Sequence, residues 1–264
     1  MIHDSSLLGP LLDIARDAGD HILTVYETDF EVATKADKTP VTEADLLAHN
    51  AIVRGLQRIT PDIPVLSEES AKIAFEERRR WESYWLVDPL DGTKEFINRN
   101  GDFTVNIALI QRGEPIVGVV YMPVNRTSYY GSLGVGAFRR EGNGAERPIH
   151  VRVNAENPVR VVASRSHRGE LLDAYLEKLG AHQVVSRGSS LKFCLVAEGA
   201  ADVYPRLGPT CEWDTGAGHA VLLAAGGHVV DLDGQPLRYN SKESLLNPHF
   251  IAYADTSRNW LQYL

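Results

Sequence analysis

The sequence predicts an α/β protein of two lobes, an α+β lobe followed by an α/β lobe. Two stretches with helical spacing come first, over residues 5–59, and strand-like runs follow up to about residue 140. After residue 158, strand-like and helix-like stretches alternate, which is typical of α/β layers. The 264 residues, of which 44% are hydrophobic, are enough for one large core or two tightly joined lobes.

The first lobe should contain two helices and a set of antiparallel strands. Apolar residues such as Leu11, Ile14 and Ile22 recur at helical spacing. Thr42 with Asp45 resembles the capping box that starts a second helix. The predicted helices are 5–26 and 42–59, and the predicted strands are 63–67, 84–87, 103–111, 115–122, 127–133 and 136–140.

The second lobe should alternate strands with helices. Asp214 stands where a helix N-cap is expected, ahead of an apolar stretch. The lobe boundary is placed near 154–158, which gives domains of residues 1–154 and 155–264. The predicted strands are 159–163, 183–186, 201–204, 228–231 and 250–253, and the predicted helices are 169–179, 190–198 and one that starts at Asp214.

Composition and charge argue against several classes of function. The net charge of −8 disfavours a nucleic-acid polymer as partner, and the charged run 76–80 is interpreted as a solvated helix face. No apolar run approaches the roughly 20 residues of a membrane span, and the N-terminus lacks the features of a signal peptide. Cys194 and Cys211 have no metal-type spacing and suggest reduced thiols. We therefore expect a cytoplasmic globular protein.

The stretch 85–96 is the most informative part of the chain. A short apolar run is interpreted as the end of a strand, and two carboxylates, Asp88 and Asp91, follow it. A proline between them restrains the backbone and Gly92 permits a tight turn, so both acids can face one point. Hard cations take oxygen ligands, and a helix start at Thr93 would favour a phosphate. Taken alone, the stretch is also compatible with a surface β-turn.

Two distant segments supply the context for this turn. Residues 64–70 form another apolar run that ends in acids, Glu68 and Glu69. Residues 213–219 place Asp214 ahead of an apolar stretch. Three acidic segments at strand or helix ends are therefore available for one site.

Together these segments resemble the inositol monophosphatase superfamily of Mg²⁺-dependent, lithium-sensitive phosphomonoesterases, over nearly the whole chain. The resemblance implies a layered αβαβα sandwich of the inositol monophosphatase and fructose bisphosphatase type. Residues 87–96, 164–167, 188–194 and 204–206 are similar to the CysQ-type 3'(2'),5'-bisphosphate nucleotidases. That branch implies hydrolysis of adenosine 3',5'-bisphosphate, a by-product of sulfate activation and transfer, to AMP and phosphate by metal-activated water.

The resemblance also implies roles for single residues, with two or three Mg²⁺ ions as cofactor. Two ions could clamp the attacking and leaving oxygens of an in-line displacement. Thr93 would orient the nucleophilic water through its hydroxyl, and Asp45 matches a position near that water, although it could also be only part of a helix start. The implied metal ligands are Glu68, Asp88, Leu90 through its carbonyl oxygen, Asp91 and Asp214, and the implied catalytic residues are Thr93, Asp45 and Glu68.

Substrate specificity is expected from the second lobe, because only one of two phosphates meets the metals. Lys192 and Arg206 are candidates for the second phosphate, with ordinary surface charges as the alternative. Ser189 could donate its hydroxyl, and His167 could stack on or hydrogen-bond the adenine. The implied substrate-binding residues are Gly92, Thr93, His167, Ser189, Lys192, Arg206 and Asp214.

Two other functions stay open at the level of sequence. One is an inositol monophosphatase or sugar bisphosphatase, because the metal motifs handle only the phosphate that is cleaved. The other is a catalytically silent phospholigand-binding regulator on the same fold. The sequence leaves open the oligomeric state and the choice between 3'- and 2'-phosphates. The resemblance raises peripheral association with the inner membrane, which no basic amphipathic helix supports.

Overall fold

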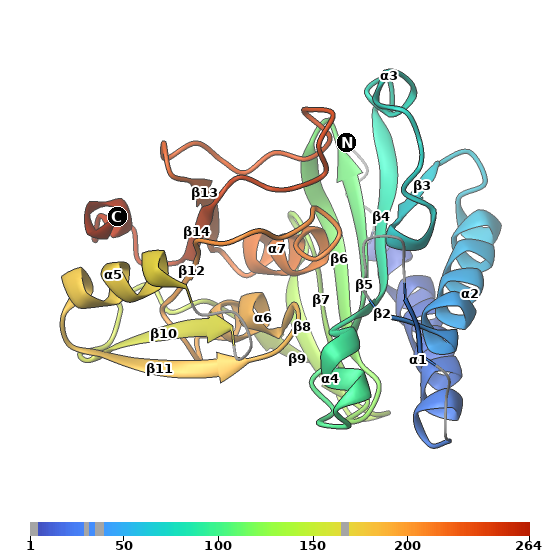
Figure 1. Ribbon diagram of the computed structural model, residues 1–264, viewed down its shortest axis with the longest axis horizontal. Coiled ribbons are helices and arrows are strands. Elements are labelled where there is room, and N and C mark those ends of the chain that lie inside the picture. Colours follow the sequence, from blue (N-terminus) through green and yellow to red (C-terminus); the bar gives the residue numbers. More distant parts are fainter. Residues whose placement is uncertain (1–4, 29–31, 35–39, 165–168) are drawn as a thin grey trace.

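A seven-stranded sheet lies beside two long helices and is built from residues 65–149 (Figure 1). The computed structural model describes residues 5–28, 32–34, 40–164 and 169–264. Neighbouring strands of this sheet are neighbours in the chain, and all pairs are antiparallel except the parallel pair β3 and β4 at one edge. The strands are β3 (Val65–Ser67), β4 (Ser83–Asp91), β5 (Thr104–Gln111), β6 (Glu114–Met122), β7 (Thr127–Ser132), β8 (Gly136–Glu141) and β9 (Arg147–Ile149).

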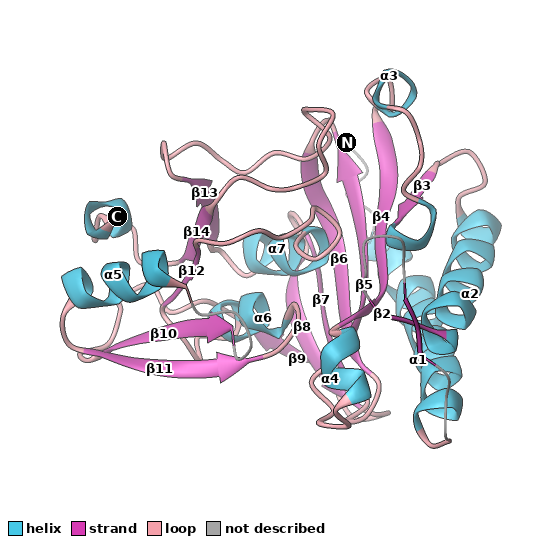
Figure 2. Cartoon of the chain, in the orientation of Figure 1, coloured by secondary structure: helices cyan, strands magenta, loops and turns pink. Residues whose placement is uncertain are grey.

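The second sheet has five strands and the order β11-β10-β12-β14-β13. Helices α6 and α7 lie between the two sheets, and α5 covers the outer face of the second sheet (Figure 2). The strands are β10 (Val159–Ser164), β11 (His182–Arg187), β12 (Val203–Arg206), β13 (His228–Asp231) and β14 (Phe250–Tyr253). The helices are α1 (Leu8–Tyr26), α2 (Glu43–Ile59), α3 (Phe75–Arg78), α4 (Thr93–Ile97), α5 (Glu170–Leu179), α6 (Leu191–Ala197) and α7 (Gly216–Ala224), with 3-10 turns η1 (Ser5–Leu7), η2 (Glu68–Ser70) and η3 (Trp260–Tyr263).

Both faces of the first sheet are covered, and β4 shows why its sequence is continuously apolar. Trp85 and Val87 pack in the core formed with α1 and α2. Tyr84 and Leu86 point to the opposite core, which they share with α6 and α7. Alternate residues of a strand face opposite sides, so a strand buried on both sides has no polar face. The layers therefore run helix, sheet, helix, sheet, helix, and the αβαβα sandwich is confirmed.

Several element boundaries differ from the sequence predictions. The strand predicted to end at residue 87 continues to Asp91, with an irregular register between Asp88 and Asp91. The predicted first helix begins with a 3-10 turn, and α2 starts at Glu43 rather than at Thr42. A short antiparallel ladder of β1 (Val32–Thr34) and β2 (Pro40–Thr42) has no counterpart among the predicted elements. The lobe boundary near residues 154–158 stays a prediction.

Arg78 contradicts the interpretation of residues 76–80 as a solvated helix face. Its side chain is buried and donates hydrogen bonds to Asn240 and to the carbonyl oxygens of Lys242 and Glu243. A guanidinium carries five donors, so one arginine can satisfy several acceptors of a loop at once. This residue ties α3 to the segment that follows β13.

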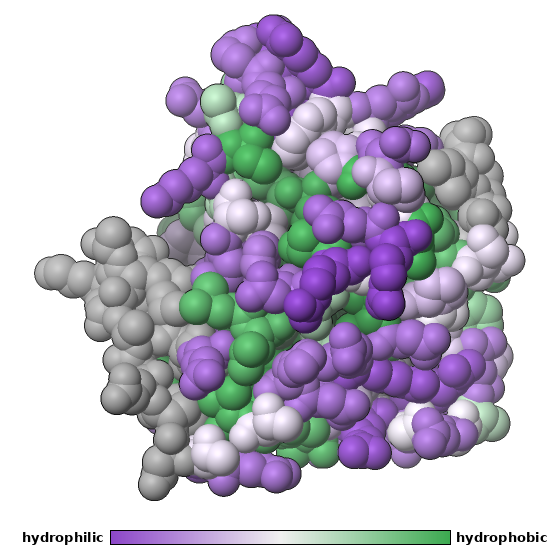
Figure 3. Space-filling view, turned by 90° about the vertical axis from the view of Figure 1, so that its right-hand side faces the viewer, coloured by the Kyte–Doolittle hydropathy of each residue, from purple (hydrophilic) through white to green (hydrophobic). Residues whose placement is uncertain are grey.

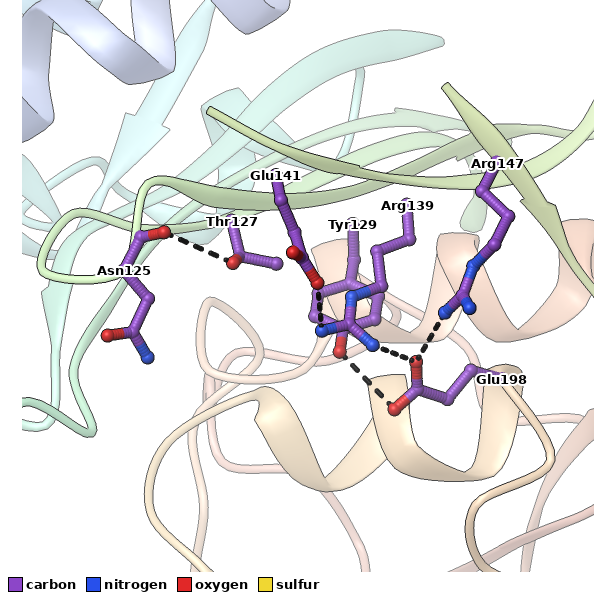
Figure 4. A network of polar contacts seen from close by, with 7 residues as sticks. All are labelled: Asn125, Thr127, Tyr129, Arg139, Glu141, Arg147 and Glu198. Atoms are coloured by element: carbon purple, nitrogen blue, oxygen red, sulfur yellow. Dashed lines mark hydrogen bonds and ion pairs between the residues drawn. The ribbon is translucent and has the colours of Figure 1, made fainter. Parts of the chain in front are cut away.

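Ion pairs fasten the C-terminal end of α6 to the first sheet (Figure 4). Glu198, directly after α6, lies 3.1 Å from Arg139 on β8 and 3.9 Å from Arg147 on β9. The Tyr129 hydroxyl on β7 donates to the same carboxylate at 3.3 Å. Arg139 also pairs with Glu141 at 2.7 Å. The other end of the same short helix reaches the site described below.

The outer face that α1 and α2 occupy is covered mainly by hydrophilic side chains, with smaller hydrophobic areas between them (Figure 3). This pattern fits two amphipathic helices whose apolar sides face the first sheet. Within the part of the chain that is described, no helix has the length and apolar character needed to cross a membrane.

Candidate active site

The parallel pairing of β3 with β4 brings two acidic segments side by side. The last residue of β3 is aligned with Val87, so Glu68 and Asp88 follow at the same edge of the sheet. Asp88 is buried, and its Oδ1 accepts a hydrogen bond from the Leu90 N–H at 3.1 Å. Asp88 and Asp91 both line one cavity of about 230 Å³.

Gly92 makes the tight turn from β4 into α4. Its φ of 96° lies in the left-handed region. A Cβ atom there would lie 3.3 Å from the carbonyl oxygen of Asp102 and from the Cα of Phe103. Both the torsion angle and the space therefore favour glycine. The turn places Thr93, the first residue of α4, in the wall of the cavity.

Asp214 reaches the cavity from the loop before α7. The prediction that it caps this helix is wrong, because α7 begins at Gly216 and Thr215 occupies the cap position. The Asp214 Oδ2 instead accepts hydrogen bonds from the Thr210 hydroxyl and the Cys211 N–H, both at 2.8 Å. The carboxylate is held by its own loop.

Three carboxylates converge at the cavity. Asp88, Asp91 and Asp214 each offer an oxygen, and these oxygens lie within 4.8 Å of one another. Burial, followed by the charges of neighbouring acids, raises the pKa of Asp88 and Asp91, and that of Asp91 reaches about 7. Burial also raises the pKa of Asp214. Clustered carboxylates repel one another, and oxygen donors are what hard divalent cations bind. The donor set therefore fits a divalent cation such as Mg²⁺.

Two further acids act on this cluster. Glu68 opens η2 and lines the cavity. Asp45 lies in the first turn of α2 and is 1% exposed. After burial, which is the largest cause, the charges of both residues contribute to the raised pKa of Asp88. The structure thus places Asp45 close enough to influence the cluster electrostatically.

Cations and a strained turn form another part of the cavity wall. Lys192 on α6 is 8% exposed, and its ammonium donates to the carbonyl oxygen of Ser189. Ser189 has a φ of 42°, and its buried hydroxyl has no hydrogen-bond partner among the described residues. Arg206, at the end of β12, donates to the Pro209 carbonyl oxygen at 2.5 Å. The wall therefore presents two positive charges and one unused donor.

The cavity gathers most residues predicted from the sequence. Asp45 is not among the residues that line the cavity, although its charge contributes to the raised pKa of Asp88. His167 lies outside the described residues, so its predicted adenine contact stays a prediction. The predicted residues that line the cavity are Glu68, Asp88, Leu90, Asp91, Gly92, Thr93, Ser189, Lys192, Arg206 and Asp214.

Two polar residues against the cluster had no role predicted from the sequence. The Ser190 hydroxyl oxygen lies 3.1 Å from Asp91 Oδ2 and 2.6 Å from the Asp214 carbonyl oxygen. The Asn106 amide nitrogen lies 2.8 Å from that hydroxyl oxygen. An asparagine inside the apolar strand β5 was the available signal, because buried polar groups in strands need specific partners.

Comparison with known proteins identifies the family. A model of the inositol monophosphatase family matches residues 4–259. The chain belongs to this family. The first sheet, the central helices and the acidic cavity described above all lie within the matched residues.

Similar proteins include several bisphosphate nucleotidases. The 3'(2'),5'-bisphosphate nucleotidase CysQ of Salmonella typhimurium is 55% identical over 246 residues, which cover 92% of this chain and 98% of that protein. The corresponding protein of Haemophilus influenzae is 40% identical over 255 residues, with 96% and 95% covered.

Solved structures show the same relationship. CysQ from Bacteroides thetaiotaomicron has a TM-score of 0.84 and 43% identity, with 98% of this chain and 100% of that chain covered. An inositol monophosphatase from Anabaena has a TM-score of 0.76 and 26% identity, with 98% and 94% covered. Sequence identity is thus higher to the CysQ structure than to this inositol monophosphatase.

Proposed function

We propose that the protein is a Mg²⁺-dependent 3'(2'),5'-bisphosphate nucleotidase that hydrolyses adenosine 3',5'-bisphosphate to AMP and phosphate. One observation carries the proposal: the three carboxylates Asp88, Asp91 and Asp214 (the acidic wall) line the same cavity as the cations Lys192 and Arg206 (the cationic wall). A substrate with two phosphates needs both walls, one for the phosphate that is cleaved and one for the phosphate that is kept. The similarity to proteins named bisphosphate nucleotidases supports the same assignment.

The acidic wall would hold the metal ions. Asp88, Asp91 and Asp214 are the proposed side-chain ligands, joined by Glu68 and by the carbonyl oxygen of Leu90. Bound divalent cations supply positive charge beside a phosphoryl group and lower the pKa of water. The raised pKa values of the aspartates indicate that a cation bound at this wall would stabilise the folded chain.

Residues of α4, η2 and α2 would orient and deprotonate the attacking water. Thr93 begins α4 and lines the cavity. A hydroxyl can both donate and accept hydrogen bonds, so we assign to Thr93 the orientation of the attacking water. Glu68 and Asp45 add negative charge close to Asp88, and we assign to them the acceptance of the proton that this water releases.

The cationic wall would hold the phosphate that is not cleaved. Arginine binds phosphate oxygens in pairs and lysine binds as a compact charge. Lys192 and Arg206 fit these roles, and the unpartnered Ser189 hydroxyl is a further donor. An inositol monophosphate carries no second phosphate and would leave these donors unused, which favours a bisphosphate as substrate.

Phosphate release with Mg²⁺ tests the proposal, with adenosine 3',5'-bisphosphate and inositol 1-phosphate compared side by side. We expect a strong preference for the nucleotide and loss of release after chelation of Mg²⁺. An Asp91→Asn variant should be inactive, whereas Asp173→Asn, an exposed aspartate on α5, should behave as wild type.

Other outcomes identify the alternatives. A preference for inositol 1-phosphate would keep the acidic wall and discard the roles of Ser189, Lys192 and Arg206. Tight binding of the nucleotide without any release of phosphate would indicate a silent ligand-binding protein instead of an enzyme.

A further inference from the structure

We propose that Asn106 and Ser190 are positioning residues that set the distance between Asp91 and Asp214 for a divalent cation. The inference rests on the proposed function of the acidic cavity as a metal site. Asp91 ends a strand of the first sheet, whereas Asp214 lies in a loop that leads into α7. These two acids are far apart in the chain, so something between them must fix their separation.

One hydroxyl group lies between the two acids. The Ser190 Oγ is 3.1 Å from the Asp91 Oδ2 and 2.6 Å from the backbone carbonyl oxygen of Asp214. An ionised carboxylate and a carbonyl only accept hydrogen bonds, so both compete for the single hydroxyl hydrogen, and the closer carbonyl is favoured. Ser190 thus contacts both halves of the acidic cluster from the start of α6.

Asn106 supplies a hydrogen-bond donor for Asp91, because the single hydroxyl hydrogen of Ser190 favours the Asp214 carbonyl oxygen. Its Nδ2 lies 2.8 Å from the Ser190 Oγ and 3.4 Å from the Asp91 Oδ2. The Thr104 hydroxyl, on the same face of β5, donates to the Asn106 Oδ1 at 3.0 Å. This contact fixes the amide so that its nitrogen faces Ser190 and Asp91, the orientation that a carboxylate partner requires.

The three residues that form this hydrogen-bond network, here called the relay, are buried. Thr104, Asn106 and Ser190 are 0%, 1% and 2% exposed. Removing one partner leaves buried donors or acceptors unsatisfied, and solvent does not replace them readily. The loss of a group that orients a metal ligand typically lowers metal affinity or activity by roughly 10- to 100-fold. The relay connects β5 of the first sheet, α6 and the loop of Asp214, which is the arrangement a positioning role requires.

Titration of the substrate-free protein with Mg²⁺ in a calorimeter tests the inference. We expect Ser190→Ala and Asn106→Leu each to weaken Mg²⁺ binding by roughly 10- to 100-fold. The double variant should bind Mg²⁺ no more weakly than the worse single variant, because both residues belong to one hydrogen-bond network around Asp91. Ser128→Ala is the matched control, because the Ser128 hydroxyl is equally buried and has no hydrogen-bond partner among the described residues.

A second measurement separates positioning from general loss of stability. At saturating Mg²⁺, the variants should recover the wild-type KM for the bisphosphate, while the Mg²⁺ concentration for half-maximal rate rises in step with the dissociation constant. Thr104→Val, which keeps both Asn106 and Ser190, should also weaken Mg²⁺ binding and carries the test if a variant of the other two does not fold.

The outcomes are distinct for this inference and for the proposed function. If Ser190→Ala and Asn106→Leu bind Mg²⁺ as tightly as Ser128→Ala does, the positioning role is refuted. If the wild type binds Mg²⁺ but releases no phosphate from the bisphosphate, the proposed function fails while the affinities of the variants still decide the positioning role. A wild type that binds no Mg²⁺ overturns both.

Discussion

The buried ammonium of Lys192 donates a hydrogen bond to the carbonyl oxygen of Ser189, whose backbone lies in the left-handed region. Burial lowers the pKa of Lys192, and the negative charge of Asp91 opposes this effect. One cation therefore stabilises a strained turn and faces the acidic cluster at the same time. Strained backbone of this kind is commonly held in place at functional sites.

Replacing Lys192 should change the binding of a bisphosphate more than that of a monophosphate. We expect Lys192→Ala to raise the KM for adenosine 3',5'-bisphosphate by about 10- to 100-fold, the equivalent of one lost charge-assisted hydrogen bond. The KM for adenosine 3'-monophosphate should rise much less. Steady-state kinetics with both substrates checks this, and Lys178→Ala on the exposed side of α5 is the control. Equal rises for both substrates would remove Lys192 from the second-phosphate site.

Asp91→Asn should abolish most activity while the protein stays folded. The amide of asparagine carries no negative charge and has one oxygen instead of two, so it should bind a cation more weakly than the carboxylate does. We therefore expect kcat/KM to fall by more than about 100-fold, which exceeds the loss typical of residues that only orient metal ligands. Phosphate release together with circular dichroism checks the prediction. Near wild-type turnover in a folded variant would contradict the role of Asp91.

The same substitution predicts the pH dependence of the metal-free protein. The pKa of Asp91 is about 7 in the folded chain, because of burial and the charge of Asp214, whereas it is about 4 when unfolded. The unfolded chain therefore releases this proton first, and the contribution of Asp91 to stability is lost as the pH rises from about 4 through 7. At higher pH, metal-free Asp91→Asn should melt at a higher temperature than wild type.

Thermal melts of both proteins between pH 5 and pH 8, with and without Mg²⁺, provide the measurement. The difference between the two proteins reports Asp91 together with the groups whose pKa its charge shifts, Asp88 and Lys192. His219, whose pKa burial lowers to about 3, contributes equally to both proteins. Saturating Mg²⁺ should remove the advantage of the variant. A difference in melting temperature that does not change with pH would contradict this assignment.

Gly92→Ala should reduce Mg²⁺-dependent activity, whereas the equivalent change at Gly142 should not. Both Gly92 and Gly142 have positive φ values, of 96° and 53°, and an alanine at either position costs about 1–2 kcal/mol for the left-handed torsion. Only at Gly92 would the new Cβ atom meet backbone, 3.3 Å from the Asp102 carbonyl oxygen. We expect both variants to lose stability in urea titrations and only Gly92→Ala to lose Mg²⁺-dependent activity.

Glu198→Gln should destabilise the protein through the anchor of α6. The carboxylate pairs with Arg139 and accepts from Tyr129, and its side chain is only 12% exposed (Figure 4). Loss of such charge-assisted contacts should lower the free energy of unfolding by about 1.5–3 kcal/mol. Glu82→Gln, which breaks the exposed pair with Arg112, should cost less than about 1 kcal/mol. Equal losses in urea titrations would contradict the anchor.

Local sequence patterns predicted the positions of acids at strand ends but not the exact path of the chain around them. The apolar run that ends at Val87 predicted that β4 ends there. The pairing with β5 instead continues to Asp91, with a register shift between Asp88 and Asp91. Asp214 precedes an apolar helix as a cap would, but its partners Thr210 and Cys211 form a loop that competes with capping. Both partners lie only three or four residues before Asp214, so the competing contacts are local, and the spacing of the apolar residues does not distinguish them from a cap.

Contacts between distant segments were beyond reach of the same reasoning. Arg78 stands in a charged run typical of a solvated helix, and it is buried only because a loop from beyond β13 supplies acceptors. Asn106 and Ser190 are separated by 84 residues and meet only when β5 and α6 are assembled. The family resemblance named ten of the residues that line the cavity, whereas the partners that hold them required the fold.

The chain order of the first sheet has a consequence for synthesis on the ribosome. The strands β3 to β9 are neighbours in both sequence and space, so they can assemble as they emerge, with short loops to close. Asp88 and Asp91 are then in place, but Asp214 and Ser190 are still to be translated. Until residue 214 has been synthesised, the group of three aspartates proposed to hold the cation is therefore incomplete.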